Sequence, residues 1–183
     1  MIIPEGNYKQ VFLCHSNFHI YQGLALIDSD KCLFLVSRAC SYDYFFKGTC
    51  LKYIIFDDNV VFNYKHLFKM ILNRCRVNIK QFYSSHTSTY QCHLILNTCK
   101  VERKILMDDG LSSYGLIKLE SRSALPITLI KKLVSFMLKS VGIVYHIQDN
   151  VNFDCFEFAY YMFPRSAPNN IGVTKLQLPK FDF

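Results

Sequence analysis

The sequence contains no tryptophan, no internal repeat and no uncharged apolar run approaching about 18 residues. The lack of such a run excludes a membrane-spanning helix. The first residues, MIIPEGNYKQ, lack the positive region followed by an apolar region that is typical of a signal peptide. Hydrophobic residues make up 51% of the chain and charged residues 19%, which excludes a disordered protein. These features predict one compact domain with a core rich in Phe and Tyr.

The eight cysteines show no CxxC pair and no metal-binding spacing, which excludes a zinc ribbon or finger. Several lie inside apolar runs, where free cysteine behaves as a small buried hydrophobe. We therefore expect reduced cysteines, a cytoplasmic protein and no bound metal. The net charge of +7 is compatible with nucleic acid, an anionic membrane surface or an anionic substrate, and equally with a role in solubility alone.

Apolar runs predict five strands, at Gln10–His15, Cys32–Ser37, Leu51–Phe56, Ile79–Ser84 and Arg103–Met107. Helical periodicity predicts a helix at Val60–Arg76, and helices are also expected at Ser16–Asp28, at Ile127–Lys139 and in the aromatic-rich segment Val151–Met162. Thr87–Thr98 alternates in part like a strand, but it connects two expected parallel strands, which need a crossover of about a dozen residues, so a helix is expected there as well. The first helix is capped by Ser16 or Asn17, and its expected apolar face consists of Phe18, Tyr21, Leu24 and Ala25. Strands that alternate with helices predict an α/β fold with an open, mostly parallel sheet.

Ligands of such sheets bind beyond the carboxyl ends of the strands. Three polar segments follow predicted strands at these ends: His15-Ser16-Asn17, Ser84-Ser85-His86 and Asp108-Asp109-Gly110. His15 and His86 each either reach this crevice or are satisfied by the backbone of a loop. No glycine-rich phosphate-binding loop occurs.

The pair Asp108-Asp109 allows two interpretations. Adjacent acids repel each other, and a carboxyl at a buried strand end suits a general base that takes a proton from a hydroxyl. Alternatively, the segment is an ordinary turn, because Asp-Gly is common in turns. Asp57-Asp58 follows the third strand in the same way, so spacing alone does not separate the two interpretations.

The segment KILMDDGLSSY, Lys104–Tyr114, resembles the acidic-acidic-glycine motif of bacterial sialyltransferases, namely glycosyltransferase family 52 and the bacterial polysialyltransferases. A first strand that runs into a helix containing Gln22, and a strand ending in Ser84-Ser85 one crossover before the motif, are similar as well. The resemblance covers roughly residues 10–150.

The resemblance implies the N-terminal half of a GT-B fold, a Rossmann-like domain that binds the acceptor. It implies Asp108 or Asp109 as the base, a CMP-activated sugar donor, and no metal or other cofactor. The remaining residues of the three segments, together with Ser112, form the expected substrate-binding set: His15, Ser16, Asn17, Ser84, Ser85, His86, Gly110 and Ser112. The implied acceptor is a glycan or glycolipid of bacterial lipooligosaccharide or capsule synthesis.

The sequence departs from this family in one respect. The family carries a His-Pro motif in its second half, and none of the six histidines here precedes a proline. We therefore expect a Rossmann-like domain at 1–163 and a linker at 164–183 that leads towards a second half not contained in the chain. The isolated chain is then expected not to transfer sugar.

A basic, apolar surface is expected from Lys118, Arg122, Lys131, Lys132 and Lys139, interleaved with Leu129, Ile130, Leu133, Phe136 and Met137. This surface either attaches the chain peripherally to the inner membrane, or it belongs to an ordinary core helix whose lysines extend their charged ends into water. The leading hypothesis is thus a sialyltransferase-like glycosyltransferase domain. The alternatives are an inactive truncated relative and a basic nucleic-acid-binding module, although the aromatic residues lie mostly in apolar segments, so no nucleic-acid partner is expected.

Overall fold

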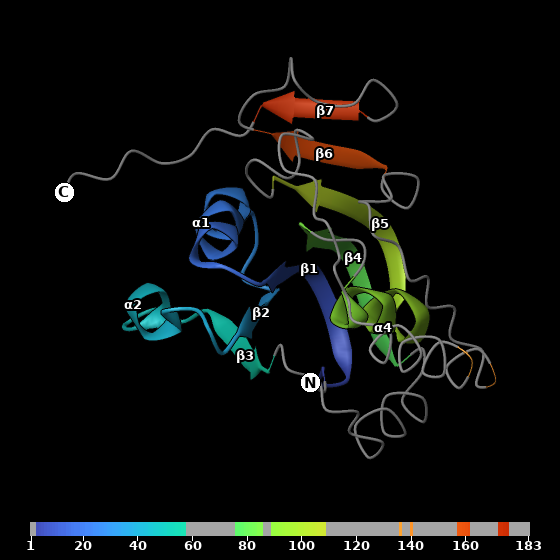
Figure 1. Cartoon of the computed structure of the whole chain (residues 1–183), viewed down its shortest axis with the longest axis horizontal. Helices are drawn as coiled ribbons and strands as arrows, with labels where there is room; N and C mark the ends of the chain where they lie inside the picture. The colour runs from blue at the N-terminus through green and yellow to red at the C-terminus, as the bar shows by residue number, and fades with distance from the viewer. Residues whose placement is uncertain are drawn as a thin grey trace, which may run out of the picture.

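The computed structural model describes residues 3–57, 76–85, 89–108, 136, 140, 157–161 and 172–175. Seven strands form one sheet in the order β3-β2-β1-β4-β5-β6-β7, and all neighbouring strands are parallel (Figure 1). The strands are β1 (Gly6–Cys14), β2 (Cys32–Ser37), β3 (Lys52–Phe56), β4 (Val77–Ser84), β5 (Lys100–Met107), β6 (Phe158–Tyr161) and β7 (Gly172–Lys175). The predicted α/β fold with an open, Rossmann-like sheet is confirmed.

Three helices connect the strands within the described part of the chain: α1 (Asn17–Leu26), α2 (Tyr42–Phe46) and α4 (Tyr90–Thr98). The helix expected at Thr87–Thr98 is confirmed by α4, whereas the one expected at Val60–Arg76 falls outside the described residues except for Arg76. Of the expected basic, apolar surface the structure describes only Phe136, whose ring is exposed. None of the described helices is long and apolar enough to cross a membrane.

The expectation of a helix at Val151–Met162 was wrong for Phe158–Tyr161, which form β6. This segment is rich in Phe and Tyr, which favour strands, and β5 offers an open edge whose hydrogen bonds it satisfies. Four residues of the stretch expected as a linker form β7, which extends the sheet beyond β6. Strand pairing with distant residues, rather than local periodicity, decided the structure of both segments.

The sheet is covered on both faces, and each face has its own apolar core (Figure 1). On one face, Cys92 and Ile95 of α4 pack against a cluster that includes Leu13, Leu35 and Phe82. On the other, Ile20 of α1 and Phe46 of α2 pack against a second cluster, whose strand members are Phe12, Cys14, Cys32, Phe34, Val36, Tyr83, Ile105 and Met107. All six residues of β2 are buried because both of its faces are covered.

The buried face of α1 differs from the one expected from its periodicity. Phe18, Tyr21, Leu24 and Ala25 are only half-buried, although Leu24 packs against the apolar cluster of this face, and the buried residues of α1 are His19, Ile20, Gln22 and Gly23. Gly23 allows this orientation, because a Cβ atom at this position would lie only 2.7 Å from Cε1 of Phe34. The helix therefore approaches the sheet closely and turns two polar side chains towards the ends of the strands.

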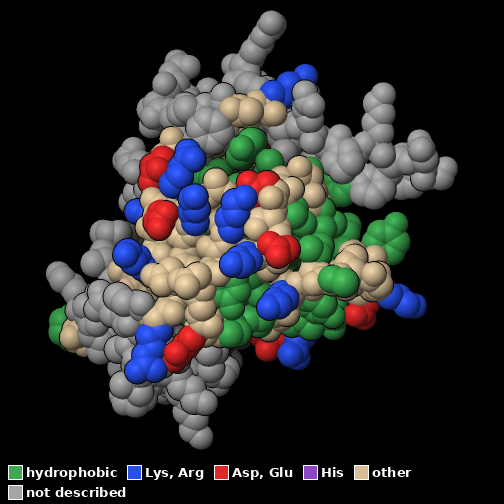
Figure 2. All heavy atoms as spheres, turned by 180° about the vertical axis from the view of Figure 1, so that it is seen from behind, with side chains coloured by type: hydrophobic (Ala, Val, Ile, Leu, Met, Phe, Trp, Pro, Cys, Tyr) green, Lys and Arg blue, Asp and Glu red, His purple; other side chains and the backbone are tan. Residues whose placement is uncertain are grey.

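Charged side chains lie on the surface as pairs of opposite sign. Ion pairs join Lys9 to Asp28 (3.3 Å), Arg38 to Asp57 (2.9 Å), Arg76 to Glu5 (2.9 Å) and Arg103 to Glu157 (3.9 Å). Figure 2 shows Lys and Arg interspersed with Asp and Glu on the face turned away from the viewer in Figure 1. Lys9, Arg38, Arg76 and Arg103 are thus locally balanced by carboxylates.

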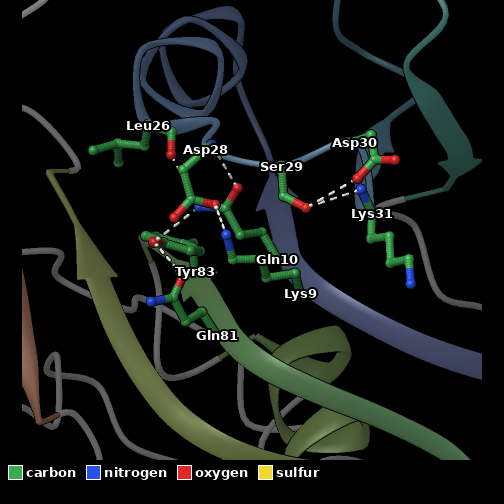
Figure 3. Close-up of polar contacts among 9 residues, drawn as sticks. All are labelled: Lys9, Gln10, Leu26, Asp28, Ser29, Asp30, Lys31, Gln81 and Tyr83. Atoms are coloured by element: carbon green, nitrogen blue, oxygen red, sulfur yellow. Dashed lines mark hydrogen bonds and ion pairs between the residues drawn. The ribbon is translucent and has the colours of Figure 1, made fainter.

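A buried polar network ties the end of α1 to the sheet (Figure 3). Gln10 of β1 donates from Nε2 to the carbonyl of Leu26 (2.9 Å) and to the hydroxyl of Tyr83 (3.2 Å), and its Oε1 accepts from the amide of Asp28 (3.0 Å). Tyr83 in turn donates to Oε1 of Gln81 (3.1 Å). Because buried polar groups need partners, this network fixes where α1 ends relative to β1 and β4.

Candidate functional site

The carboxyl ends of the parallel strands form one edge of the sheet, here called the carboxyl edge. At its centre lie β1 and β4, which are neighbours although the chain leaves β1 towards α1 on one face and β4 towards α4 on the other. This arrangement is a topological switch point, where α/β proteins bind ligands. Of the sequence-predicted residues, His15 and Ser16 follow β1, Ser84 ends β4, Ser85 follows it and Asp108 follows β5.

His19 of α1 joins the ends of β1 and β4. Its Nδ1 atom accepts a hydrogen bond from the backbone N–H of His15 (3.2 Å) and lies 3.2 Å from the hydroxyl oxygen of Ser85. Because Nδ1 accepts from an N–H group it carries no proton there, so the Ser85 hydroxyl donates to it. His19 and Ser85 are both buried, at 2% and 1% exposure. His19 therefore connects the ends of β1 and β4, the two strands of the switch point.

Gln22 makes an equivalent connection to the end of β5. Its Nε2 donates to the carbonyl of Asp108 (2.6 Å), and its Oε1 accepts from the amide of the same residue (3.1 Å). Both residues are completely buried. One side chain therefore binds both the N–H and the C=O group of Asp108.

Ser16, Asn17 and Ser84 lie at the carboxyl edge in structural positions. The Ser16 hydroxyl caps α1 by accepting from the amide of His19 (3.3 Å), which confirms the predicted cap. Asn17 accepts from the amide of Ser41 through Oδ1 (2.8 Å) and donates to its hydroxyl (3.4 Å), so it ties α1 to the loop before α2. Ser84 is buried as the last residue of β4 and pairs with Leu13 in the sheet.

The two acidic pairs of the sequence differ sharply in environment. Asp57 follows β3 with an exposed side chain that pairs with Arg38, and its carbonyl accepts a hydrogen bond from Gln91 of α4 (3.4 Å). Asp108 is buried beside the switch point. Asp57 is thus exposed and ion-paired, whereas Asp108 is fully buried and bound to α1 through Gln22.

The side chain of His15 extends along the carboxyl edge towards β3. Its ring meets that of Phe56 edge-on, with the ring centroids 5.3 Å apart. Cys14, directly before it, is buried beside Cys40, and burial raises the pKa of the Cys14 thiol well above its ordinary value, with Cys40 as a second cause. Cys14 therefore stays a thiol at neutral pH and is no candidate for a nucleophile.

Asp109, Gly110, Ser112 and His86 lie outside the described residues. Within the described ranges, no group of three or more His, Cys, Asp or Glu side chains is arranged to hold a metal ion. The site described here consists of His15, Ser16, Ser84, Ser85 and Asp108, held together by His19 and Gln22; it is called the candidate site below.

Sequence reasoning missed the roles of His19 and Gln22, which it assigned to an ordinary helix. The signal that points to them is their spacing: two polar residues one helical turn apart, followed by glycine, in an otherwise apolar helix. When such residues are buried they need partners, and the polar strand ends are the nearest ones. Compared with protein-family models, with curated proteins and with solved structures, the chain shows no significant match.

Proposed function

We propose that this chain is the acceptor-side domain of a sialyltransferase-like glycosyltransferase. In this proposal Asp108 or Asp109 removes the proton from an acceptor hydroxyl while that oxygen attacks the anomeric carbon of a CMP-activated sugar. A new glycosidic C–O bond forms, the bond from the anomeric carbon to the CMP phosphate oxygen breaks, and CMP leaves with inversion at that carbon. The proposed acceptor is a bacterial surface glycan or glycolipid.

The observation that carries the proposal is the burial of Asp108 at the carboxyl edge, beside the switch point. A general base needs a fixed position within hydrogen-bonding distance of the hydroxyl that it deprotonates. The two hydrogen bonds from Gln22 supply the fixed position, and the hydroxyls of Ser16 and Ser85 lie at the ends of neighbouring strands. Such a polar edge suits a sugar, which offers hydroxyl groups to donors and acceptors alike.

Four ion pairs on the surface are unfavourable for nucleic-acid binding at their positions. A nucleic-acid surface needs unpaired Lys and Arg side chains interleaved with exposed aromatic rings. In the described residues, Lys9, Arg38, Arg76 and Arg103 are paired with carboxylates, and Lys and Arg are interspersed with Asp and Glu (Figure 2). Phosphates would have to displace these carboxylates.

The direct test is binding of a lactose-terminated oligosaccharide to the purified chain, measured by saturation-transfer NMR, with maltose as the control sugar. We expect the acceptor to bind in about the millimolar range, maltose to bind no better than background, and CMP not to bind, since the donor belongs to the other half of a GT-B enzyme. Asp109→Ala should weaken acceptor binding about tenfold. Asp57→Ala, the matched change in the other acidic pair, should leave it unchanged.

A transfer assay with CMP-sialic acid completes the test. Turnover that Asp108→Asn or Asp109→Asn abolishes would support the chemistry and would contradict only the expectation that the donor needs a second half. Absence of acceptor binding, or binding of DNA or RNA with a steep dependence on salt, would show that the proposed function is wrong.

A further inference from the structure

We propose that Gln22 is a positioning residue: it completes the hydrogen-bond ladder of β5 and thereby sets the direction in which Asp108 presents its carboxyl group. The link to activity rests on the function proposed above, whereas the structural role of Gln22 does not.

The paired register of β4 and β5 ends before Asp108. The last pair is Ser84 with Leu106, so β4 supplies no later partner for the backbone of β5, and on the other side of β5 the pairing with β6 ends at Met107 with Tyr160. Asp108 is nevertheless completely buried, and a buried N–H or C=O group without a partner is strongly unfavourable. A side-chain amide has an acceptor oxygen and a donor nitrogen in one plane, as a peptide group does. The amide of Gln22 binds both the N–H and the C=O group of Asp108, as the backbone of a neighbouring strand would.

Two hydrogen bonds to one residue fix more than its position. The amide of Asp108 belongs to the peptide plane before its Cα atom, and its carbonyl belongs to the plane after it. Peptide groups are planar, so holding both planes fixes φ and ψ of Asp108 and therefore the direction of its Cα–Cβ bond. The second plane also contains the backbone nitrogen of Asp109, so the start of the next residue is set as well.

The close approach of α1 makes this contact feasible. Gly23, the neighbour of Gln22, lies directly over the rings of Phe34 and Phe12, where a Cβ atom would lie 2.7 Å and 3.2 Å from their nearest atoms. A larger residue at Gly23 would push α1 away from the sheet, and hydrogen bonds of 2.6 Å and 3.1 Å would not survive that movement.

A matched residue on the other face of the sheet provides the control. Gln91 of α4 is also a buried glutamine, and its Nε2 donates to the carbonyl of Asp57 at the end of β3. It makes one longer bond of 3.4 Å, to a residue with an exposed side chain. Both glutamines therefore bind strand ends, but only Gln22 holds both sides of a buried acid.

The test compares Gln22→Met with Gln91→Met, since methionine keeps an unbranched chain of similar length without strong hydrogen-bonding groups. Hydrogen exchange of the Asp108 amide and the dissociation constant of the lactose-terminated acceptor are measured in each variant. We expect Gln22→Met to accelerate exchange of the Asp108 amide about tenfold or more and to weaken acceptor binding about tenfold, while the amide of Leu13 in the core stays protected. Gln91→Met should change neither quantity for Asp108.

If Gln22→Met does not fold, Gln22→Glu decides the matter. Its ionised carboxylate still accepts from the Asp108 amide but cannot donate to the Asp108 carbonyl, and protonation restores that donor. We expect its acceptor affinity, relative to wild type, to rise as the pH falls; a ratio of one at every pH would overturn the proposal. Unchanged exchange in a folded Gln22→Met variant would overturn it as well. If the wild type binds no acceptor, the proposed function fails, and the exchange data alone still decide the role of Gln22.

Discussion

Tyr83 illustrates how strongly the core acts on a single side chain. It lies buried beneath α1, where its ring stacks on Phe12 with the centroids 4.5 Å apart and its hydroxyl lies between Gln10 and Gln81 (Figure 3). Burial raises the pKa of Tyr83 from 10.0 to about 12, and the hydrogen bond from Gln10 opposes this shift only partly. The folded state thus favours the neutral phenol.

This shift predicts a loss of stability in alkaline solution. An unfolded chain releases the Tyr83 proton near pH 10 and the folded one only near pH 12, so ionisation favours unfolding as the pH rises between these values. Tyr83→Phe removes this contribution, and its free energy of unfolding should decline less steeply over this range, by up to about 1.4 kcal/mol per pH unit. Urea denaturation of both proteins at several pH values measures the difference; parallel pH profiles would contradict it.

His19 offers a second test at the level of one residue. Only its Nδ1 atom holds the end of β1 and the hydroxyl of Ser85. Asparagine places a side-chain oxygen close to the position of Nδ1, whereas glutamine reaches the position of Nε2. We therefore expect His19→Asn to be about 1–2 kcal/mol more stable than His19→Gln in urea denaturation, because Asn leaves fewer buried groups without partners. Equal losses would show that Nδ1 is not the atom that matters.

At the level of elements, α1 is the structure that assembles the candidate site. Its buried side carries two polar residues, His19 and Gln22, that reach the ends of β1, β4 and β5. Ile20 and Gly23 supply the apolar contact with the sheet. Leu24 and Leu26 are half-buried and pack against the same apolar cluster, whereas Phe18 and Tyr21, the largest apolar side chains of the helix, do not belong to it. Gly23 sets the closest approach of the helix to the sheet.

Gly23→Ala tests this orientation. The added Cβ atom would lie 2.7 Å from Cε1 of Phe34, so α1 or the ring must move. We expect a loss of about 1–3 kcal/mol in the free energy of unfolding, as is typical of an overpacked core.

Phe34→Leu removes the obstructing ring and serves as the control. The double variant should lose less stability than the sum of the two single losses, because the new methyl group then occupies vacated space. Strictly additive losses would mean that Gly23 is not required for close packing against Phe34.

At the level of the whole molecule, the cysteines report on the redox state of the chain. The six cysteines within the described ranges are free; Cys14, Cys32, Cys40 and Cys92 are buried, and Cys50 is exposed. We expect all eight thiols of the sequence to titrate in denaturant without reductant, and Cys50 to react first in the native protein. A titre of half the thiols or fewer would contradict the expectation of a reduced protein.

The sequence alone determined much of the architecture. Apolar runs located the first five strands to within a few residues, since a strand covered on both faces must be apolar along its length. Parallel pairing then required the polar residues after these strands, His15, Ser85 and Asp108 among them, to share one edge. The helix α4 followed from chain length rather than from periodicity, because its segment alternates in part like a strand, whereas a crossover between parallel neighbours needs about a dozen residues.

Only the tertiary structure decided which of these residues meet. Local patterns do not report hydrogen bonds between residues 86 positions apart, such as Gln22 and Asp108, and these bonds exist because Gly23 lets α1 dock closely. The same limit applies to β6, whose aromatic residues suit a helix or a strand until the free edge of β5 accepts them. The first acids of the two pairs, Asp57 and Asp108, are alike in sequence but differ in structure for the same reason: Asp57 meets solvent and Arg38, and Asp108 is buried against α1.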